Sequence, residues 1–398
     1  MPKLMKILVI SHMYPSSFNM TSGIFVHEQV KALVKQGHEV KVISPVPWAP
    51  FPLNQVSKKW NRYSQIETKT KLDGIDIYYT RYLNLPSSML FEYYGSFFYL
   101  GMKKLIENLH QTFPFDIIHA HVALPDGAAA IKIKDRFNVP LVVTIHGQDL
   151  QHTIYRNKKS KEIIADIFNR ADKVILVSSK LKSLAEYELG SSDKYVVIHN
   201  GINLDDISSE FIEDNKTNER IILSLSNLYP SKGIDLNIHA ISKLCNKYPD
   251  LKYVIVGDGP ERNRLESLAN GLLIQQNVEF VGRLPHEMAL EYIKTCEIFS
   301  LPSWKEGFGI AYIEAMAYGK PVIGVKGEGI EDVIQQNVTG LLVKPKNVES
   351  LVEAIDYLLA NQKIGKEIGR NAQEMVYREM TWDINVQKTV SHYKAVIH

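Results

Sequence analysis

The most restrictive feature of this sequence is a series of short, uninterrupted Val/Ile-rich runs, each followed by a longer amphipathic segment. Parallel strands that are covered on both faces give solid apolar runs of this kind, whereas half-exposed strands alternate apolar and polar residues. Alternation with helices, such as those predicted at residues 26–36 and 161–170, indicates an α/β fold with right-handed crossovers. The first half contains candidate strands at residues 6–10, 39–43, 75–79, 117–120, 141–145, 173–177 and 195–198.

The same pattern restarts after residue 200. Residues 205–220 are polar and lack a clear period, which predicts a connection between domains. Further candidate strands follow at residues 221–226, 252–256, 278–281, 298–301, 321–325 and 340–343. We therefore predict two Rossmann-like, doubly wound domains, at residues 1–200 and 201–376, which face a cleft. Ligands of such sheets bind outside the carboxyl ends of the strands, and interdomain clefts commonly hold small molecules.

Composition excludes several other classes of protein. The 398 residues include 46 basic and 44 acidic side chains, so no concentrated basic charge predicts nucleic-acid binding. Cys245 and Cys296 lie far apart and outside any metal-ligand spacing, which argues against a disulfide framework or a zinc site and favours a reducing cytoplasm. The apolar run at residues 7–10 is too short for a signal peptide or a membrane span, and it predicts the first buried strand.

Residues 89–105 are dense in aromatic side chains and contain Lys103 and Lys104 near their end. One interpretation is a helix that touches a membrane surface or a lipid-linked acceptor. The other is a helix whose apolar stripe packs against the core of the first domain. The sequence leaves both open.

The segment from Pro302 to Pro321 carries the strongest chemical signal. A predicted strand ends at residue 301, a loop with Gly307 and Gly309 follows, and a helix is expected to begin near Gly309. Free amides at a helix start bind anions, and glycine lets the backbone approach a diphosphate closely. Glu306 can accept hydrogen bonds from sugar hydroxyls and Glu314 from ribose hydroxyls. The alternative for the two glutamates is a solvated surface pair.

This segment, with Glu306 and Glu314 set in the pattern EGFGIAYIEAMAYGKPVI, resembles the signature of the retaining GT-B glycosyltransferases of family 4. The resemblance extends over nearly the whole chain. It implies that Glu306 contacts the donor sugar as a catalytic residue. It implies donor-binding roles for Gly307, Phe308, Gly309 and Glu314.

Other segments carry the resemblance into both domains. Gly23 matches a family loop that covers the donor phosphates and the acceptor, and Lys232 matches a cation on the diphosphate. The family usually has arginine where this sequence has Asn227, so a neutral amide replaces a planar bidentate cation. Either Lys232 and the helix start suffice, or another cation such as Arg283 takes part in donor binding.

Two histidines follow apolar runs at predicted strand ends, where active sites of such sheets collect. His146 matches the family histidine near the anomeric carbon, which implies a catalytic role. His121 matches a position facing the cleft, in the vicinity of the acceptor or the sugar. Each imidazole can donate a hydrogen bond to a phosphate or sugar oxygen, and each can equally be a structural histidine.

The resemblance implies a retaining enzyme that uses a nucleotide-diphosphate sugar, with UDP as the default nucleotide. No convincing Asp-x-Asp motif is present, because Asp73 and Asp76 have the wrong spacing, so we expect neither a metal nor another cofactor. Similar bacterial enzymes build exopolysaccharide or teichuronic-acid-type polymers. This similarity implies a glycan or polyprenyl-linked acceptor and a cytoplasmic protein that makes peripheral contact with the inner face of the plasma membrane. A non-catalytic sugar-nucleotide-binding protein of the same fold is the alternative. Residues 377–398 are expected to form a helix that crosses back to the first domain, as in the family.

Overall fold

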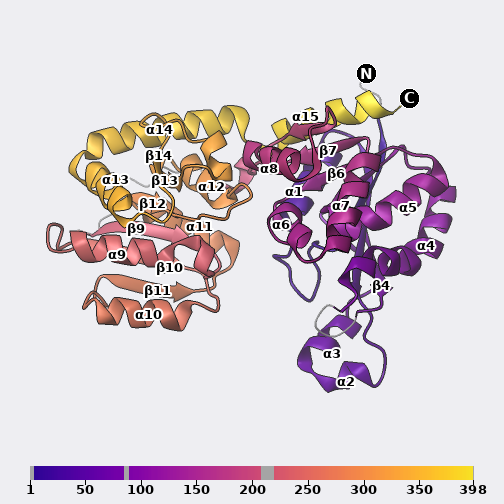
Figure 1. The fold of residues 1–398 in the computed structure, drawn as a ribbon, viewed down its shortest axis with the longest axis horizontal. Coiled ribbons are helices and arrows are strands. Elements are labelled where there is room, and N and C mark those ends of the chain that lie inside the picture. Colours follow the sequence, from indigo (N-terminus) through magenta and orange to yellow (C-terminus); the bar gives the residue numbers. More distant parts are fainter. Residues whose placement is uncertain (1–3, 85–88, 208–218, 398) are drawn as a thin grey trace. The chain divides into compact units, whose positions relative to one another are not determined.

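A computed structural model describes residues 4–84, 89–207 and 219–397 (Figure 1). The chain divides into two compact units. Unit 1 consists of Met1–His199 and Trp382–His398, and unit 2 consists of Asn200–Thr381. Residues 208–218 of the expected connection lie outside the described residues.

Unit 1 is built on an eight-stranded sheet with the order β3-β4-β2-β1-β5-β6-β7-β8. All neighbouring strands are parallel except β3 and β4, and β1 is almost completely buried at the centre. The strands are β1 (Lys6–Ile10), β2 (Glu39–Pro47), β3 (Lys69–Leu72), β4 (Ile75–Tyr82), β5 (Ile117–His121), β6 (Leu141–Ile145), β7 (Lys173–Leu176) and β8 (Tyr195–Val197).

Strand β3 is not among the strands expected from the sequence, because it is a polar edge strand without an apolar run. It pairs antiparallel with β4 across Asp73 and Gly74, whose φ angles of 49° and 78° are both positive. An Asp-Gly pair favours the tight turn of a hairpin with two such residues. That dipeptide is the local signal by which the hairpin could have been found.

Helices cover the unit 1 sheet, with α1 packing on α15 and with α4 and α7 packing on α5. Helix α7 begins earlier than expected because the side chain of Asn157 accepts a hydrogen bond from the amide of Ser160 (2.8 Å), which caps the helix start. The helices are α1 (Ile24–Lys35), α2 (Leu53–Val56), α3 (Lys58–Ser64), α4 (Tyr94–Thr112), α5 (Ala128–Phe137), α6 (Gln148–Gln151), α7 (Lys158–Arg170), α8 (Ser179–Leu189) and α15 (Trp382–Val396).

The aromatic segment at residues 89–105 is not one helix from its start. Leu90 has φ 55° and ψ 33°, a left-handed conformation that an α-helix cannot contain, so α4 begins only at Tyr94. One stripe of α4 is buried in unit 1 and includes Phe98, Met102 and Ile106, as the packing interpretation expects. Met89, Leu90 and Leu100 remain exposed.

The last helix also begins later than residue 377. Residues 377–379 complete α14 of unit 2, where the hydroxyl of Tyr377 donates to the carbonyl of Ala317 (3.2 Å). Helical geometry ends at Met380, and Thr381 forms a parallel bridge with Ile202, so the chain is extended there. Helix α15 starts at Trp382, and its apolar side chains join the core around β1.

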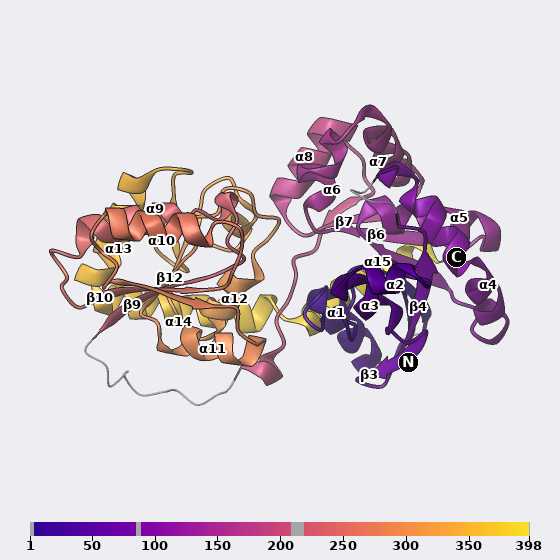
Figure 2. The ribbon, with the colours of Figure 1, turned by 90° about the horizontal axis from the view of Figure 1, so that it is seen from below.

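Unit 2 contains a six-stranded parallel sheet with the order β11-β10-β9-β12-β13-β14. Figure 2 shows α9, α10 and α13 on one face of this sheet and α11, α12 and α14 on the other. The strands are β9 (Arg220–Leu225), β10 (Leu251–Val256), β11 (Val278–Gly282), β12 (Ile298–Ser300), β13 (Val322–Val325) and β14 (Leu341–Val343). The helices are α9 (Ile234–Leu244), α10 (Arg262–Gly271), α11 (His286–Thr295), α12 (Ile310–Ala317), α13 (Val348–Ala360) and α14 (Gln362–Glu379).

Both sheets reverse their strand order at one point, which confirms the prediction of two doubly wound units. The reversal lies between β1 and β5 in unit 1 and between β9 and β12 in unit 2. Connections leave such a pair of strands toward opposite faces, and ligands bind at the carboxyl ends there. The loops after β1, β5, β9 and β12 are therefore the first places to look for a site. Among the described helices, none combines the length and apolar character needed to span a bilayer.

Candidate functional site

In unit 2, the strand-order reversal brings together Lys232, in the loop after β9, and Glu306, in the loop after β12. The ammonium of Lys232 donates to a carboxylate oxygen of Glu306 at 2.5 Å. Their side chains are only 20% and 17% exposed, so the charges interact in a partly desolvated setting. Two residues 74 positions apart in sequence thus form one charged group at the ligand-binding end of the sheet.

Backbone contacts fix the turn that carries Lys232. The carbonyl of Ser231 accepts hydrogen bonds from the hydroxyl of Ser303 (3.1 Å) and the amide of Trp304 (2.9 Å). Gly233 has φ 68°, and a Cβ there would lie 2.3 Å from the carbonyl oxygen of Pro302. Only glycine permits this approach. The turn is therefore held against the segment that leads to Glu306.

Helix α12 begins at Ile310, directly after the glycine loop. Gly309 has φ 95° and ψ 71°, and a Cβ there would lie 2.6 Å from the ring of Tyr312. The amide of Glu306 donates to the Glu328 carboxylate at 2.8 Å. A Cβ on Gly329 would meet the Gly307 carbonyl oxygen at 2.2 Å, so the 328–329 segment lies tightly beneath the loop. The helix start expected from the sequence is present.

The remaining expected donor-binding residues of unit 2 differ in their exposure. Phe308 is 2% exposed, so its ring is packed inside unit 2 and anchors the loop. Glu314 lies on the second turn of α12, and its carboxylate is 2.7 Å from Nε2 of His286, a contact that the sequence does not indicate. Arg283 is exposed after β11, and Asn227 is exposed in the loop after β9.

A buried hydrogen-bond network supports the strands that carry this loop pair. The side-chain amide of Asn237, on α9, donates to the hydroxyls of Ser224 (3.1 Å) and Tyr253 (3.1 Å) and to the carbonyl of Ser300 (3.0 Å). The hydroxyl of Ser300 donates back to the Asn237 carbonyl at 2.8 Å. A satisfied polar network in a core fixes the relative position of its members. It ties β9, β10 and β12 to α9 below the loops of Lys232 and Glu306.

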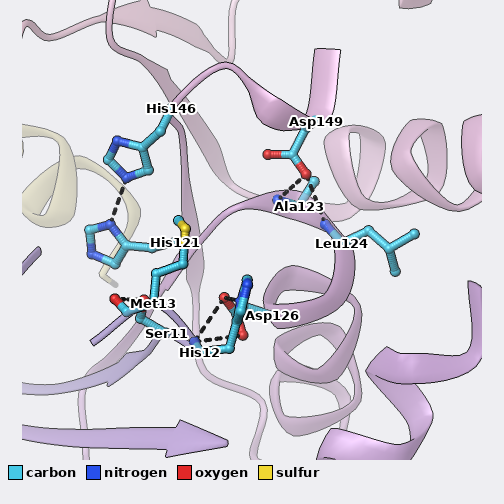
Figure 3. A network of polar contacts seen from close by, with 9 residues as sticks. All are labelled: Ser11, His12, Met13, His121, Ala123, Leu124, Asp126, His146 and Asp149. Atoms are coloured by element: carbon cyan, nitrogen blue, oxygen red, sulfur yellow. Dashed lines mark hydrogen bonds and ion pairs between the residues drawn. The ribbon is translucent and has the colours of Figure 1, made fainter. Parts of the chain in front are cut away.

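In unit 1, the strand-order reversal carries a second polar group (Figure 3). Asp126 follows β5 and is completely buried. Its carboxylate accepts the amide of His12 (3.1 and 3.2 Å), and Nδ1 of His12 lies 2.7 Å from Oδ2. Burial alone would lower the pKa of His12, but the charge of Asp126 and its hydrogen bond outweigh burial, and the pKa is raised. Burial in turn raises the pKa of Asp126. Sequence reasoning did not single out this pair, which joins positions 114 apart.

Asp149, near the start of α6, holds the loop after β5. One carboxylate oxygen accepts the amides of Ala123 (3.0 Å) and Leu124 (3.1 Å), as Figure 3 shows. The other oxygen is buried without a hydrogen-bond partner among the described residues. Burial raises the pKa of Asp149 to about 6, although the two amide hydrogen bonds act in the opposite direction. This loop connects His121 to Asp126.

We predict that the contribution of Asp149 to stability falls as pH rises. Because its folded pKa lies above the ordinary value of 3.8, the folded state binds more protons between the two values. The stabilisation is present below pH 3.8 and is lost as pH rises through about 6. An Asp149→Asn variant keeps an oxygen for the two amides and does not titrate. Its stability relative to the parent should rise by about 2 kcal/mol between about pH 4.5 and about pH 7.5, which is most of the roughly 3 kcal/mol that the full shift represents.

The measurement is urea unfolding of both proteins at about pH 4.5 and about pH 7.5, followed by tryptophan fluorescence. Other titrating groups are common to the two proteins, so their effects cancel in the difference. Equal pH dependence of the parent and the variant would show that Asp149 titrates normally.

The two histidines expected at strand ends form a pair. His121 is the last residue of β5 and His146 follows β6, and Nδ1 of His121 lies 3.0 Å from Nε2 of His146. Burial lowers the pKa of His146 to about 3 and holds that of His121 well below its ordinary value, with His119 and His146 acting in the same direction. Both rings are therefore neutral at physiological pH. The ring of Phe25 lies 4.5 Å from that of His146.

Gly23 caps the start of α1 in a left-handed conformation, with φ 60°. A Cβ there would lie 2.0 Å from the carbonyl oxygen of Met13, which also accepts the hydroxyl of Ser11 (2.7 Å). The position therefore requires glycine because the loop after β1 folds back on itself. Gly23, His121 and His146 belong to unit 1, and the other expected site residues belong to unit 2. In the described part of the chain, no three His, Cys, Asp or Glu side chains gather as metal ligands.

Comparison with known proteins identifies the family. The model described as Glycosyltransferase Family 4 matches residues 22–206, and the model described as Glycosyl transferases group 1 matches residues 206–375. The chain is 28% identical to a putative teichuronic acid biosynthesis glycosyltransferase, TuaC, of Bacillus subtilis, over 98% of this chain and 99% of that protein. It is 27% identical to the N-acetyl-alpha-D-glucosaminyl L-malate synthase of Bacillus anthracis, over 99% and 97%.

Solved structures share the fold over the whole length. A sucrose-phosphate synthase from Thermosynechococcus elongatus superimposes with a TM-score of 0.79 at 21% identity, covering 98% of both chains. Anabaena HepE in complex with UDP gives 0.74 at 18% identity, covering 98% of this chain and 100% of that one. The two family models together span most of the sequence, and they agree with the resemblance of the 302–321 segment. The chain therefore belongs to the family 4 glycosyltransferases, which have the GT-B fold.

Proposed function

We propose that this glycosyltransferase moves a sugar from a nucleotide-diphosphate donor, by default a UDP-sugar, to a glycan or polyprenyl-linked acceptor with retention of anomeric configuration. The observation that carries the proposal is the Lys232–Glu306 pair beside the glycine loop and the start of α12. A cation, the amides of a helix start and a carboxylate are groups that can bind the phosphates and the sugar hydroxyls of such a donor. All of them lie at the strand-order reversal of unit 2.

Departure of the nucleotide diphosphate leaves negative charge on its phosphates. Lys232 and the amides at the start of α12 would neutralise this charge as preorganised groups, without a metal ion. A bound diphosphate would also attract the Lys232 ammonium away from Glu306. The Glu306 carboxylate would then accept hydrogen bonds from the sugar hydroxyls. The two members of the ion pair would thereby bind the two parts of the donor, Lys232 the diphosphate and Glu306 the sugar.

The proposed reaction keeps attack and departure on the same face of the sugar. The leaving phosphate accepts the proton of the acceptor hydroxyl as the new glycosidic bond forms and the bond to phosphate breaks. His146 would donate a hydrogen bond to the donor sugar, and Gly23 would let its loop approach the phosphates. In this proposal Glu314 contacts the ribose, and Arg283 is the cation that takes the place of the family arginine, where Asn227 stands.

The relatives support the choice of donor and acceptor class. Anabaena HepE binds UDP and UDP-glucose, and the Bacillus subtilis relative is named for teichuronic acid biosynthesis. We therefore propose a role in a cell-envelope polymer, at the cytoplasmic face of the membrane. The alternative, a sugar-nucleotide-binding protein without transferase activity, is favoured by one observation, the neutral and exposed Asn227 in the donor loop.

Thermal-shift measurements with UDP-, GDP- and ADP-sugars test the donor. A ligand at 100 times its Kd stabilises the folded state by about 2.7 kcal/mol, so the correct nucleotide should raise Tm clearly and the others should not. Product analysis with the stabilising donor then separates a transferase from a binding protein. Addition of EDTA tests metal independence, since full loss of activity that manganese restores would contradict it. Absence of a shift with all three nucleotides would refute donor binding.

A further inference from the structure

The His121–His146 contact has the geometry of a direct hydrogen bond between two imidazoles. The planes of the two rings differ by 11°, their centroids are 5.3 Å apart and the facing nitrogens are 3.0 Å apart. The facing atoms are Nδ1 of His121 and Nε2 of His146, and Figure 3 shows the rings edge to edge. Because both rings are neutral, one of these nitrogens carries the proton and the other accepts it.

The two outer nitrogens of the pair show where the second proton can be. Nε2 of His121 and Nδ1 of His146 are buried, and neither has a hydrogen-bond partner among the described residues. If His121 donates from Nδ1, its Nε2 is a lone pair and the free N–H is on Nδ1 of His146. If His146 donates from Nε2, the free N–H is on His121. The pair therefore always presents one donor and one acceptor.

Burial decides between the two arrangements. His121 is 1% exposed, within β5, and its ring lies 4.4 Å from that of His119, whereas His146 is partly exposed in the loop after β6. Both outer nitrogens are buried, but His146 is the residue that lies partly at the surface, so an N–H on its Nδ1 is the one that an incoming ligand oxygen can pair. This favours a proton on Nδ1 of both histidines.

The ring of His119 is fixed from both sides. Its Nδ1 is 2.6 Å from the hydroxyl of Tyr393, on α15, and its Nε2 is 2.7 Å from the hydroxyl of Thr144. Both ring nitrogens of His119 therefore have partners, and the ring packs against His121 without forming a hydrogen bond to it. Within unit 1, helix α15 thus helps to fix the ring of His119, which packs against His121.

We propose that His121 is a positioning residue, which donates from Nδ1 to His146 and so keeps Nδ1–H of His146 as a hydrogen-bond donor for a neutral oxygen of the sugar. The pairing itself follows from the geometry, and the sugar contact rests on the proposed function. Hydrogen-bond partners of this kind set which nitrogen of a functional histidine bears the proton.

Nitrogen-15 NMR of the histidine-labelled free protein reads the tautomers directly. The expected result is a proton on Nδ1 of both His121 and His146, and a proton on Nε2 of His146 would overturn the proposal. The side-chain amide of asparagine can replace the Nδ1–H donor, so His121→Asn should leave the tautomer of His146 unchanged. His121→Asp offers only an acceptor and should move the proton of His146 to Nε2.

Turnover of the same variants tests the consequence. His121→Asn should keep kcat within about threefold, while His121→Asp and His121→Leu should lose about tenfold, the factor expected for one buried hydrogen bond. His392→Asn, on α15 outside the pair, is the control and should retain parental kcat. Equal losses for the Asn and Leu variants would refute the positioning role. If the parent protein transfers no sugar, the proposed function fails, while the tautomers still decide the pairing.

Discussion

Replacing Glu306 with glutamine should lower kcat by a factor on the order of 10²–10³ while the fold stays intact, as expected for the loss of one preorganised charged group at the reacting sugar. Glutamine has nearly the same shape, but it removes the negative charge that Lys232 meets at 2.5 Å. It also weakens the acceptor for sugar hydroxyls. The measurement is steady-state transfer with the donor found by thermal shift, together with circular dichroism to verify the fold.

A matched control separates this effect from the loss of any surface carboxylate. Glu349, on α13, also pairs with a lysine, Lys243, but its side chain is 67% exposed. Exposed pairs contribute about 0–1 kcal/mol, so Glu349→Gln should leave kcat unchanged. The reciprocal variant Lys232→Met should also raise the KM for the donor, since it removes the cation for the diphosphate. Parental turnover in Glu306→Gln would place the chemistry elsewhere.

Replacing Gly257 with alanine should destabilise unit 2 by about 3 kcal/mol or more, the sum of backbone strain and overpacking. Gly257 follows β10 with φ 136°, and a Cβ would lie 1.8 Å from the carbonyl oxygen of Ser226. That oxygen belongs to the backbone, so it cannot move aside as a flexible side chain could. The clash would displace the loop after β9, which leads to Lys232, so activity should fall together with stability.

Urea unfolding followed by circular dichroism and by tryptophan fluorescence, to which Trp304 contributes from unit 2, measures this effect. Gly271→Ala is the control, because Gly271 ends α10 and a Cβ there meets nothing within 4 Å. Alanine in a helix is favoured over glycine by about 0.5–1 kcal/mol, so this variant should be equal to or slightly more stable than the parent. An unchanged unfolding midpoint in Gly257→Ala would show that the loop adapts.

Much of the fold could be predicted because parallel strands that are buried on both faces appear in the sequence as uninterrupted apolar runs. Strands β1 and β6, which are buried along almost their whole length, have the predicted limits, and the other predicted strands differ by a few residues at their ends. Strand β3 was not predicted, because an edge strand need not be apolar. The starts of α4 and α15 were misplaced because single residues, Leu90 and Met380, leave helical geometry in a way that side-chain periodicity does not show.

The candidate site, like the fold, could be predicted from the sequence only in part. The loop at Glu306–Gly309 could be found because the amides and glycines that bind an anion are contiguous in the chain. The partner of Glu314 could not be found because His286 is 28 residues away, and the His12–Asp126 pair was missed because its members are 114 residues apart. Nothing in either local sequence indicates the other member of the pair.

By itself, the sequence determined the class of fold, the positions of most strands and the anion-binding helix start, because each depends on burial or backbone geometry within a short segment. Only the tertiary structure decided which side chains share a proton or a charge. Lys232 pairs with Glu306, His12 with Asp126 and His121 with His146 because the strand order brings the carboxyl ends of separate strands together. Burial raises the pKa of Asp126 and lowers those of His121 and His146, and this burial exists only in the folded chain.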